Sequence, residues 1–217
     1  MSFPFSAALF DLDGTLVDSA SDIAEAVNRL LDDEGLARVD EPLIRTWIGE
    51  GAPALLGMAL SHAGSARVVE ELMPRFMVHY GDCLLLQPRL YPGVAETLDA
   101  LVAMEVPLAV CTNKPEAYAA PLLEHMGIAD RFQGVVAGGT LSERKPHPLP
   151  LRHLAGKLGA PVERCLMVGD SETDFLAAQA AGAPVVLVSY GYRRHFDLHA
   201  AGALAVIDRF DELLSLA

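Results

Sequence analysis

Cysteine is scarce in this chain of 217 residues: Cys83, Cys111 and Cys165 are an odd number and have no CxxC spacing. This argues against the disulfide framework of a secreted protein. Cys111 and Cys165 lie in apolar runs, so we expect both to be small core residues. The sequence also lacks a basic stretch before an apolar N-terminal segment and any apolar run near the ~18 residues of a membrane span. We therefore expect a soluble, cytoplasmic protein.

Positive charge is scarce as well, because 16 Lys and Arg residues face 29 Asp and Glu residues, giving a net charge of −13. Such a chain is a poor general binder of nucleic acid or of an anionic membrane. A small anionic substrate stays open, since a few local cations can bind it. Hydrophobic residues make up 52 % of the chain, which excludes a disordered protein. The length favours one domain, or one domain with an insert. The chain is expected to be a monomer or a homodimer, and its length does not decide between them.

Short apolar runs alternate with helix-like segments over most of the chain. The candidate strands are Ala7–Leu12, Pro107–Thr112, Gln133–Ala137, Cys165–Gly169, Pro184–Ser189 and, at an edge, Ala203–Ile207. The candidate helices are Glu116–Met126, Pro148–Leu158, Thr173–Ala181 and Asp211–Leu216. Strands that are apolar on both faces are typical of a parallel sheet covered by helices. The alternation predicts an α/β fold with a doubly wound, mostly parallel, Rossmann-like sheet.

One region, from Val17 to about Pro88, contains no convincing strand. Its helical candidates are Asp22–Asp33, Pro42–Ile48, Ala52–His62 and Val68–Leu85. Ser19 or Ser21 could cap the first of these helices. We therefore expect an α-helical domain at residues 17–91, inserted into an α/β core that comprises residues 1–16 and 92–217.

The candidate chemistry begins with the sequence DLDGT, which contains Asp11 and Asp13 and follows the first apolar run. The same residue types form ordinary turns, but ligands of open α/β sheets bind at the carboxyl ends of the strands. One carboxylate can attack as a nucleophile, while the other exchanges protons with a leaving group or water. A crowded acidic pair favours Mg²⁺ as its counter-ion, because Mg²⁺ prefers oxygen ligands.

Three weaker patterns follow later strands. Thr112 stands just before a candidate helix, where its hydroxyl can hold a phosphoryl oxygen or simply cap the helix. Lys145 lies in the sequence KPHP, whose prolines fix the loop, and it can neutralise a phosphate, although most lone lysines are solvated. Asp170 and Asp174 share one face if a helix begins there. Asp170 is then placed to bind a cation and Asp174 to support it, with helix capping as the ordinary alternative.

An acid, a hydroxyl, a lysine and a second acid at four successive strand ends resemble the haloacid dehalogenase superfamily, specifically its phosphatases. The matching motifs are DLDGT (11–15), TN (112–113), KPHP (145–148) and GDSETD (169–174). The inserted helices match the cap domain that this superfamily often carries. The stretches FDLDGTLVDS, TWIGEGA, TNKP, KPHP and SYGY further resemble the bacterial phosphoglycolate phosphatases.

The resemblance implies a Mg²⁺-dependent phosphomonoester hydrolase, with 2-phosphoglycolate as the favoured small phosphorylated metabolite. It implies that Asp11 attacks phosphorus to give an aspartyl-phosphate, and that Asp13 protonates the leaving alkoxide and then activates water. The implied phosphoryl-group contacts are Thr112, Asn113 and Lys145. The implied Mg²⁺ ligands are the Asp11 carboxylate, the Asp13 backbone carbonyl and Asp170, with Asp174 in support.

The cap implied by the resemblance would supply specificity. Gly49, Glu50 and Gly51 form a loop before a candidate helix, and the glycines could bring N–H groups to a substrate carboxylate. Glu50 is compatible with this only if its side chain points to solvent or pairs with Arg45. Arg45 and Arg89 are candidate cations for the substrate, although surface positions are the commoner fate of arginine. Hinges are expected near Leu16–Asp18 and Arg89–Pro92.

Other functions remain open on this sequence. They are a phosphatase for another metabolite such as a sugar phosphate, a phosphosugar mutase that uses the same aspartyl-phosphate, and a non-catalytic phosphate-binding protein. The presence of Asp11, Asp13, Thr112, Lys145 and Asp170 disfavours the last of these. His195 and His199 are spaced like a helical metal pair, but the sequence HExxH is absent.

Overall fold

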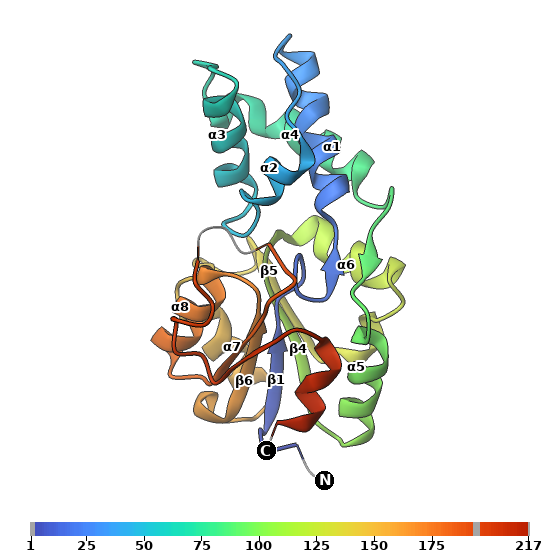
Figure 1. Cartoon of the computed structure of the whole chain (residues 1–217), viewed down its shortest axis with the longest axis vertical. Helices are drawn as coiled ribbons and strands as arrows, with labels where there is room; N and C mark the ends of the chain where they lie inside the picture. The colour runs from blue at the N-terminus through green and yellow to red at the C-terminus, as the bar shows by residue number, and fades with distance from the viewer. Residues whose placement is uncertain (1–2, 193–195, 217) are drawn as a thin grey trace.

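A six-stranded sheet forms the centre of the computed structural model, which describes residues 3–192 and 196–216 (Figure 1). The strand order is β5-β4-β1-β6-β7-β8, and every neighbouring pair is parallel. The strands are β1 (Ala7–Phe10), β4 (Leu108–Pro115), β5 (Gly134–Gly138), β6 (Cys165–Gly169), β7 (Val185–Val188) and β8 (Ala205–Ile207). The predicted doubly wound α/β sheet is confirmed, including its edge strand.

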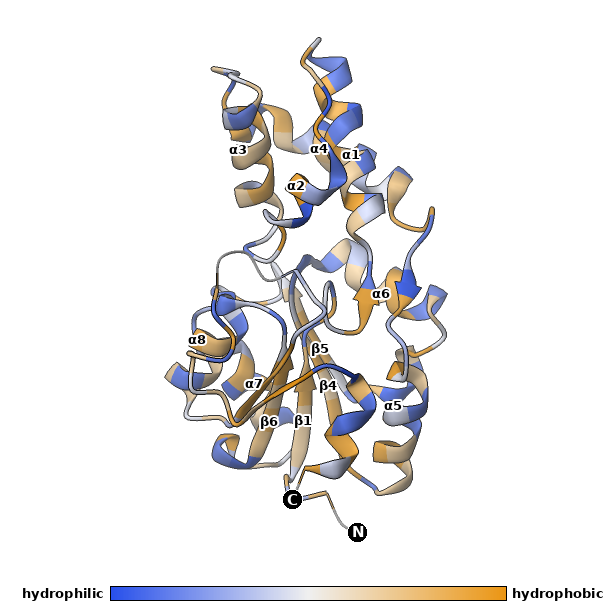
Figure 2. Ribbon diagram, viewed as in Figure 1, coloured by the Kyte–Doolittle hydropathy of each residue, from blue (hydrophilic) through white to orange (hydrophobic). Residues whose placement is uncertain are grey.

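Helices cover both faces of the sheet. One face packs on α5 (Val94–Ala103), α6 (Glu116–His125) and the 3₁₀ helix η3 (Phe210–Ser215). The other face packs on α7 (Leu149–Lys157) and α8 (Glu172–Ala181). In β1, Ala8 and Phe10 belong to the first face and Ala7 and Leu9 to the second. Burial on both faces explains why the strands are apolar throughout, as their orange colour in Figure 2 shows. Helix α5 was not predicted.

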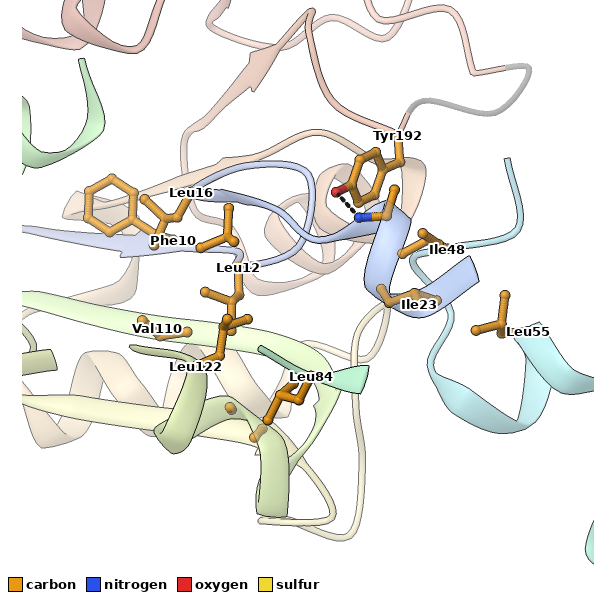
Figure 3. Packing of buried hydrophobic residues seen from close by; sticks show 14 of the residues in the cluster. Phe10, Leu12, Leu16, Ile23, Ile48, Leu55, Leu84, Val110, Leu122 and Tyr192 are labelled. Atoms are coloured by element: carbon orange, nitrogen blue, oxygen red, sulfur yellow. Dashed lines mark hydrogen bonds between the residues drawn. The ribbon is translucent and has the colours of Figure 1, made fainter. Parts of the chain in front are cut away.

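Four helices follow the first strand and stand beyond the carboxyl ends of the strands (Figure 1). They are α1 (Ala20–Asp33), α2 (Glu41–Arg45), α3 (Ala52–His62) and α4 (Val69–Cys83). The predicted helical character of this region is confirmed, with α2 ending earlier than expected. Buried side chains of α1, among them Ile23 and Leu30, belong to the same apolar cluster as Phe10 of the sheet. Figure 3 shows this packing where the helices meet the sheet.

The two passages between the sheet and these helices form a short antiparallel ribbon. Strand β2 (Val17–Asp18) pairs with β3 (Arg89–Leu90), and the Tyr91 N–H donates to the Leu16 carbonyl. The prediction of no strand at Val17 was therefore wrong, because two-residue strands carry no detectable period. Both segments that were expected to act as hinges lie in this ribbon.

One local prediction, the position of Thr112, needs correction. Strand β4 continues to Pro115, so Thr112 lies within a strand rather than before a helix, and the pairing with β5 shifts register between Cys111 and Pro115. Such irregularities re-aim side chains near active sites.

Among the described residues, no helix is both long and apolar enough to cross a membrane. His195 lies outside the described residues.

Candidate active site

The predicted acidic motifs meet where the sheet reverses its winding. From β1 the chain adds β4 and then β5 on one side, and it returns to place β6 on the other side of β1. Asp11 directly follows β1, and Asp170 directly follows β6. A crevice outside the carboxyl ends of the strands at such a switch point is the usual ligand site of an open α/β sheet.

Asp11, Asp170 and Asp174 form a buried cluster. One carboxylate oxygen from each residue lies within 4.8 Å of the other two. The only ammonium group bonded to the cluster among the described residues is Lys145, which is 2 % exposed. Its Nζ lies 2.9 Å from Asp11 Oδ1 and 2.6 Å from Asp174 Oδ1. Three carboxylates and one ammonium group leave excess negative charge at this point.

Asp174 is held differently from Asp170. Its Oδ2 accepts hydrogen bonds from the backbone N–H groups of Asp170 and Ser171, and from the Ser171 hydroxyl. With Oδ1 bonded to Lys145, both oxygens of Asp174 are occupied. Helix α8 begins at Glu172, so the expectation of a shared helix face was wrong. The Asp170 N–H bond to Asp174 Oδ2 brings the two residues together, beside a capping box formed by Ser171 and Asp174. Asp170 lies before the first residue of α8, so its backbone does not follow helical geometry.

Burial sets the protonation behaviour of the cluster. It raises the pKa of Asp11 to about 7, even though Lys145 opposes the shift. It also raises the pKa of Asp170, and the charges of Asp174 and Asp11 add to the rise. For Lys145, burial lowers the pKa but the two neighbouring carboxylates outweigh it, so the net pKa is raised and the ammonium form persists. Among the described residues, the buried Asp11 Oδ1 has the Lys145 ion pair and no further hydrogen-bond partner. An oxygen-preferring divalent cation fits this donor set.

Glycine permits the close approach of the backbone to Asp170. A Cβ atom at Gly14, whose φ is +91°, would lie 2.3 Å from Asp170 Oδ2. A Cβ atom at Gly191 would lie 2.2 Å from the Asp170 Cβ. Any side chain at either position would therefore displace the Asp170 carboxylate.

Asp11 and Asp13 open into one pocket between the sheet and the helices that follow β1. Residues of the sheet side that line it are Asp11, Asp13, Thr112, Asn113, Lys114 and Pro115. Residues of the helical side are Ile23, Ile48, Gly49, Gly51, Ala52, Leu55 and Tyr80.

Other predicted contacts do not line this pocket. Glu50 is exposed and lines neighbouring hollows of the surface instead, so the structure does not bring it to Asp11. Arg45 is bonded to the Asp18 and Glu41 carboxylates. Arg89 is exposed on β3. The two arginines considered as substrate cations are therefore placed elsewhere.

Asn113 joins the two sides of the pocket. Its side-chain N–H groups donate to the Gly49 carbonyl at 3.0 Å and to the Lys145 carbonyl at 2.9 Å. The Thr112 hydroxyl oxygen accepts from the Lys114 N–H at 3.1 Å. Asn113 thus ties the Gly49 loop and the Lys145 loop to the end of β4.

The comparisons with known proteins agree with this geometry. The family model described as haloacid dehalogenase-like hydrolase matches residues 8–188. The chain belongs to the haloacid dehalogenase-like hydrolases. It is therefore an enzyme, and its class is that of the phosphoric monoester hydrolases.

Relatives of this hydrolase match along nearly the whole chain. It is 44 % identical over 214 residues to the phosphoglycolate phosphatase of Rhodospirillum rubrum, which covers 95 % of this chain and 88 % of that one. The crystal structure of a predicted phosphoglycolate phosphatase from Haemophilus somnus is 38 % identical with a TM-score of 0.92, covering 98 % of this chain and 97 % of the other. CbbY from Rhodobacter sphaeroides, in complex with phosphate, is 25 % identical with a TM-score of 0.82 and 96 % coverage of both.

In this hydrolase, Asp13 is paired with Lys114, a residue for which the sequence predicted no role. Lys114 Nζ donates to the Asp13 oxygens Oδ1 at 3.0 Å and Oδ2 at 3.3 Å. The Ser19 hydroxyl also donates to Asp13 Oδ1, at 2.6 Å. A lysine at the carboxyl end of an apolar strand, two residues after Thr112, was an available signal. The other partner of Lys114, Tyr80, lies on α4 and 34 residues earlier in the chain. No sequence pattern indicated this contact.

Tyr192 is a second residue without a predicted role. Its hydroxyl accepts from the Ser19 N–H at 2.7 Å and the Ala20 N–H at 3.0 Å, and donates to Asp18. Figure 3 shows the Tyr192 ring over the start of α1. Neither Ser19 nor Ser21 caps this helix through its side chain, so that expectation was wrong. The Tyr192 backbone N–H donates to Asp170 Oδ2, which links the acidic cluster to α1.

Proposed function

We propose that this enzyme hydrolyses 2-phosphoglycolate to glycolate and phosphate in a Mg²⁺-dependent reaction. The observation that carries the proposal is that Asp11 and Asp13 line one pocket, while the carboxylate cluster and Lys145 lie buried beside Asp11. The substrate is supported by the name of the relative from Rhodospirillum rubrum, which matches along most of both chains.

The donor set around Asp11 fits a magnesium ion. We assign the Asp11 carboxylate, the Asp13 backbone carbonyl and Asp170 as its ligands. Asp174 supports from outside: its Oδ1 is bonded to the Lys145 ammonium group, and its Oδ2 holds the start of α8 through the Asp170 and Ser171 backbone N–H groups and the Ser171 hydroxyl. When bound, Mg²⁺ supplies positive charge that offsets the repulsion between the Asp11 carboxylate and an anionic phosphate.

The chemistry proceeds in two displacements at phosphorus. In the first, an Asp11 oxygen forms a bond to phosphorus as the bond to the glycolate oxygen breaks, and Asp13 gives its proton to that leaving oxygen. In the second, Asp13 takes a proton from water as the water oxygen attacks phosphorus. The Asp11–phosphorus bond then breaks, and the Asp11 carboxylate and inorganic phosphate are released.

Thr112 and Lys145 hold the phosphoryl oxygens in this account. The Thr112 hydroxyl lines the pocket and is oriented by the Lys114 N–H. Lys145 remains an ammonium ion beside Asp11, where it stabilises negative charge that develops on the transferring group. Asn113 positions Gly49 and the Lys145 loop through its two amide hydrogen bonds.

We also propose that residues 17–91 act as a cap domain on a core that comprises residues 1–16 and 92–217. The helical side of the pocket supplies mainly apolar walls and the Gly49–Gly51 loop, whereas the sheet side supplies all its carboxylates. Closure of such a cap would exclude water from the nucleophile until the leaving group has gone.

The test is phosphate release from 2-phosphoglycolate beside sugar phosphates and nucleotides, measured as kcat/KM with Mg²⁺ and with a chelator. We expect a clear lead for 2-phosphoglycolate that the chelator abolishes, and no turnover by Asp11→Asn. Equal turnover of all substrates, or a lead for a sugar phosphate, would contradict the substrate. Isomerisation of a sugar phosphate without phosphate release would indicate a mutase.

A further inference from the structure

Lys114 is a buried cation inside the pocket, not on the protein surface. It lies near the end of β4 and is 4 % exposed. Its Nζ donates to both oxygens of Asp13 and to the Tyr80 hydroxyl oxygen at 2.6 Å. Burial lowers the pKa of Lys114, but the charge of Asp13 and the Tyr80 hydroxyl outweigh it, so the net pKa is raised and the ammonium form persists.

No other positive side chain lines this pocket within the part of the chain that the structure describes. The charged residues in its wall are Asp11, Asp13 and Lys114. Lys145 is engaged by the buried cluster, and it serves the phosphoryl group in the proposed reaction. Among the described residues, Lys114 is therefore the cation in the pocket wall that can bind a second anionic group of a substrate.

We propose that Lys114 is the specificity-determining residue that binds the carboxylate of the substrate. This inference rests on the proposed phosphatase function and deepens it. A small phosphoester with a carboxylate on the neighbouring carbon would place one anion at Asp11 and Lys145 and the other at Lys114. The apolar side chains of Ile48 and Leu55, which line the same pocket, surround this pair and strengthen it by excluding water.

The same contact links substrate choice to the acid–base group. While Lys114 donates to both Asp13 oxygens, these oxygens are occupied and are not directed at a leaving group. A substrate carboxylate that takes Lys114 as its partner releases Asp13 to face the ester oxygen. A phosphoester without the second anion leaves Lys114 bonded to Asp13. Such a substrate should therefore bind more weakly and also have a lower kcat.

Tyr80 gives the helical side a part in this selection. Its hydroxyl on α4 accepts from Lys114, and its ring packs against Phe76 and Tyr118 with centroids 5.7 and 4.9 Å away. The hydroxyl therefore holds the ammonium group from the helical side of the pocket, whereas Asp13 holds it from the sheet side. Lys114 can exchange Asp13 for a substrate carboxylate while it keeps Tyr80 as its second partner.

The test compares 2-phosphoglycolate with ethyl phosphate, in which a methyl group replaces the carboxylate. We expect Lys114→Met to lower kcat/KM for 2-phosphoglycolate by about 10²-fold or more, because this substrate loses its charge partner. The kcat/KM for ethyl phosphate should stay the same or rise by up to about threefold, because it loses no partner and Asp13 is released from Lys114. Lys114→Arg keeps a cation and should keep much of the preference. Lys157→Met, which removes an exposed lysine, is the matched control and should change neither substrate.

Inhibition gives a readout that does not need turnover. The inert phosphonate 3-phosphonopropionate should inhibit the wild type more tightly than propylphosphonate, and Lys114→Met should abolish this difference. An equal loss for both substrates, or an unchanged preference, would overturn the role of Lys114 and leave the phosphatase standing. A wild type that shows no preference for 2-phosphoglycolate would overturn both the role and the substrate. No phosphate release from any monoester would overturn the proposed function itself.

Discussion

At the scale of the residue, Asp11, the proposed nucleophile, is held where its negative charge is unfavourable. Burial raises its pKa from an ordinary value of 3.8 to about 7. At pH values below 3.8 the group is protonated in both the folded and the unfolded chain, so no stability is lost. Between pH 3.8 and 7 the unfolded chain ionises Asp11 while the folded chain keeps the proton, so the stability that protonated Asp11 contributes falls progressively and is fully lost once pH has risen through 7.

We therefore expect Asp11→Asn to stabilise the metal-free protein while it abolishes turnover. The gain should be on the order of a few kcal/mol at pH 8 and smaller at pH 5, measured as thermal and urea unfolding with a chelator. Asp130→Asn, at a surface carboxylate that is 86 % exposed, is the control and should be nearly neutral. A gain of equal size at both pH values, or a loss at pH 8, would contradict the account.

The residues of the site differed in how far the sequence predicted them. Asp11, Asp13, Thr112 and Asn113 line one pocket because parallel strands end at one edge of a sheet, and that rule needs only the strands. The partner of Asp13 was missed. Whether Lys114 points to solvent or into the pocket depends on the irregular end of β4 and on Tyr80 from α4, and neither leaves a local pattern.

At the scale of the element, the start of α1 is capped by a side chain from a distant loop. The Tyr192 hydroxyl accepts from the N–H groups of Ser19 and Ala20. The Arg45 guanidinium lies 4.9 Å from the centre of the Tyr192 ring. Periodicity predicted α1 itself, since its apolar stripe is local. It could not predict the cap, because the ordinary candidate Ser19 instead bonds to Asp13.

We expect Tyr192→Phe to destabilise the protein by about 1–2 kcal/mol, the usual effect of losing a helix cap. The measurement is urea unfolding at equilibrium, with hydrogen exchange of the first turn of α1 as the local readout. Ser21→Ala is the matched control, since it removes a hydroxyl of the same turn that does not cap the helix. A loss of stability no larger than that of the control would show that Tyr192 does not cap α1.

At the scale of the whole molecule, the acidic chain concentrates its few buried ammonium groups at one place. The chain carries 29 acidic and 16 basic residues, yet Lys114 and Lys145 are both buried at the site. The order of the sheet brings Asp11 and Asp170 together. The alternation of strands and helices was enough to predict that both residues follow strands of one parallel sheet, whereas their placement in one site was an expectation from the family resemblance. The short ribbon that joins the sheet to the helices, and the Asn113 contacts across the pocket, come from tertiary packing alone.

The most direct test of the central claim, that Asp11 and Asp13 share one reaction, is a burst experiment with Asp13→Asn. The substrate p-nitrophenyl phosphate has a leaving group that needs no acid, so the first displacement should proceed while the second, which needs a base, stalls. With Mg²⁺ we predict a burst of one p-nitrophenolate per site and a phosphoryl group on the Asp11 peptide after acid quench. Asp11→Asn should give no burst. Steady release without a burst, or a phosphoryl group on another residue, would contradict the account.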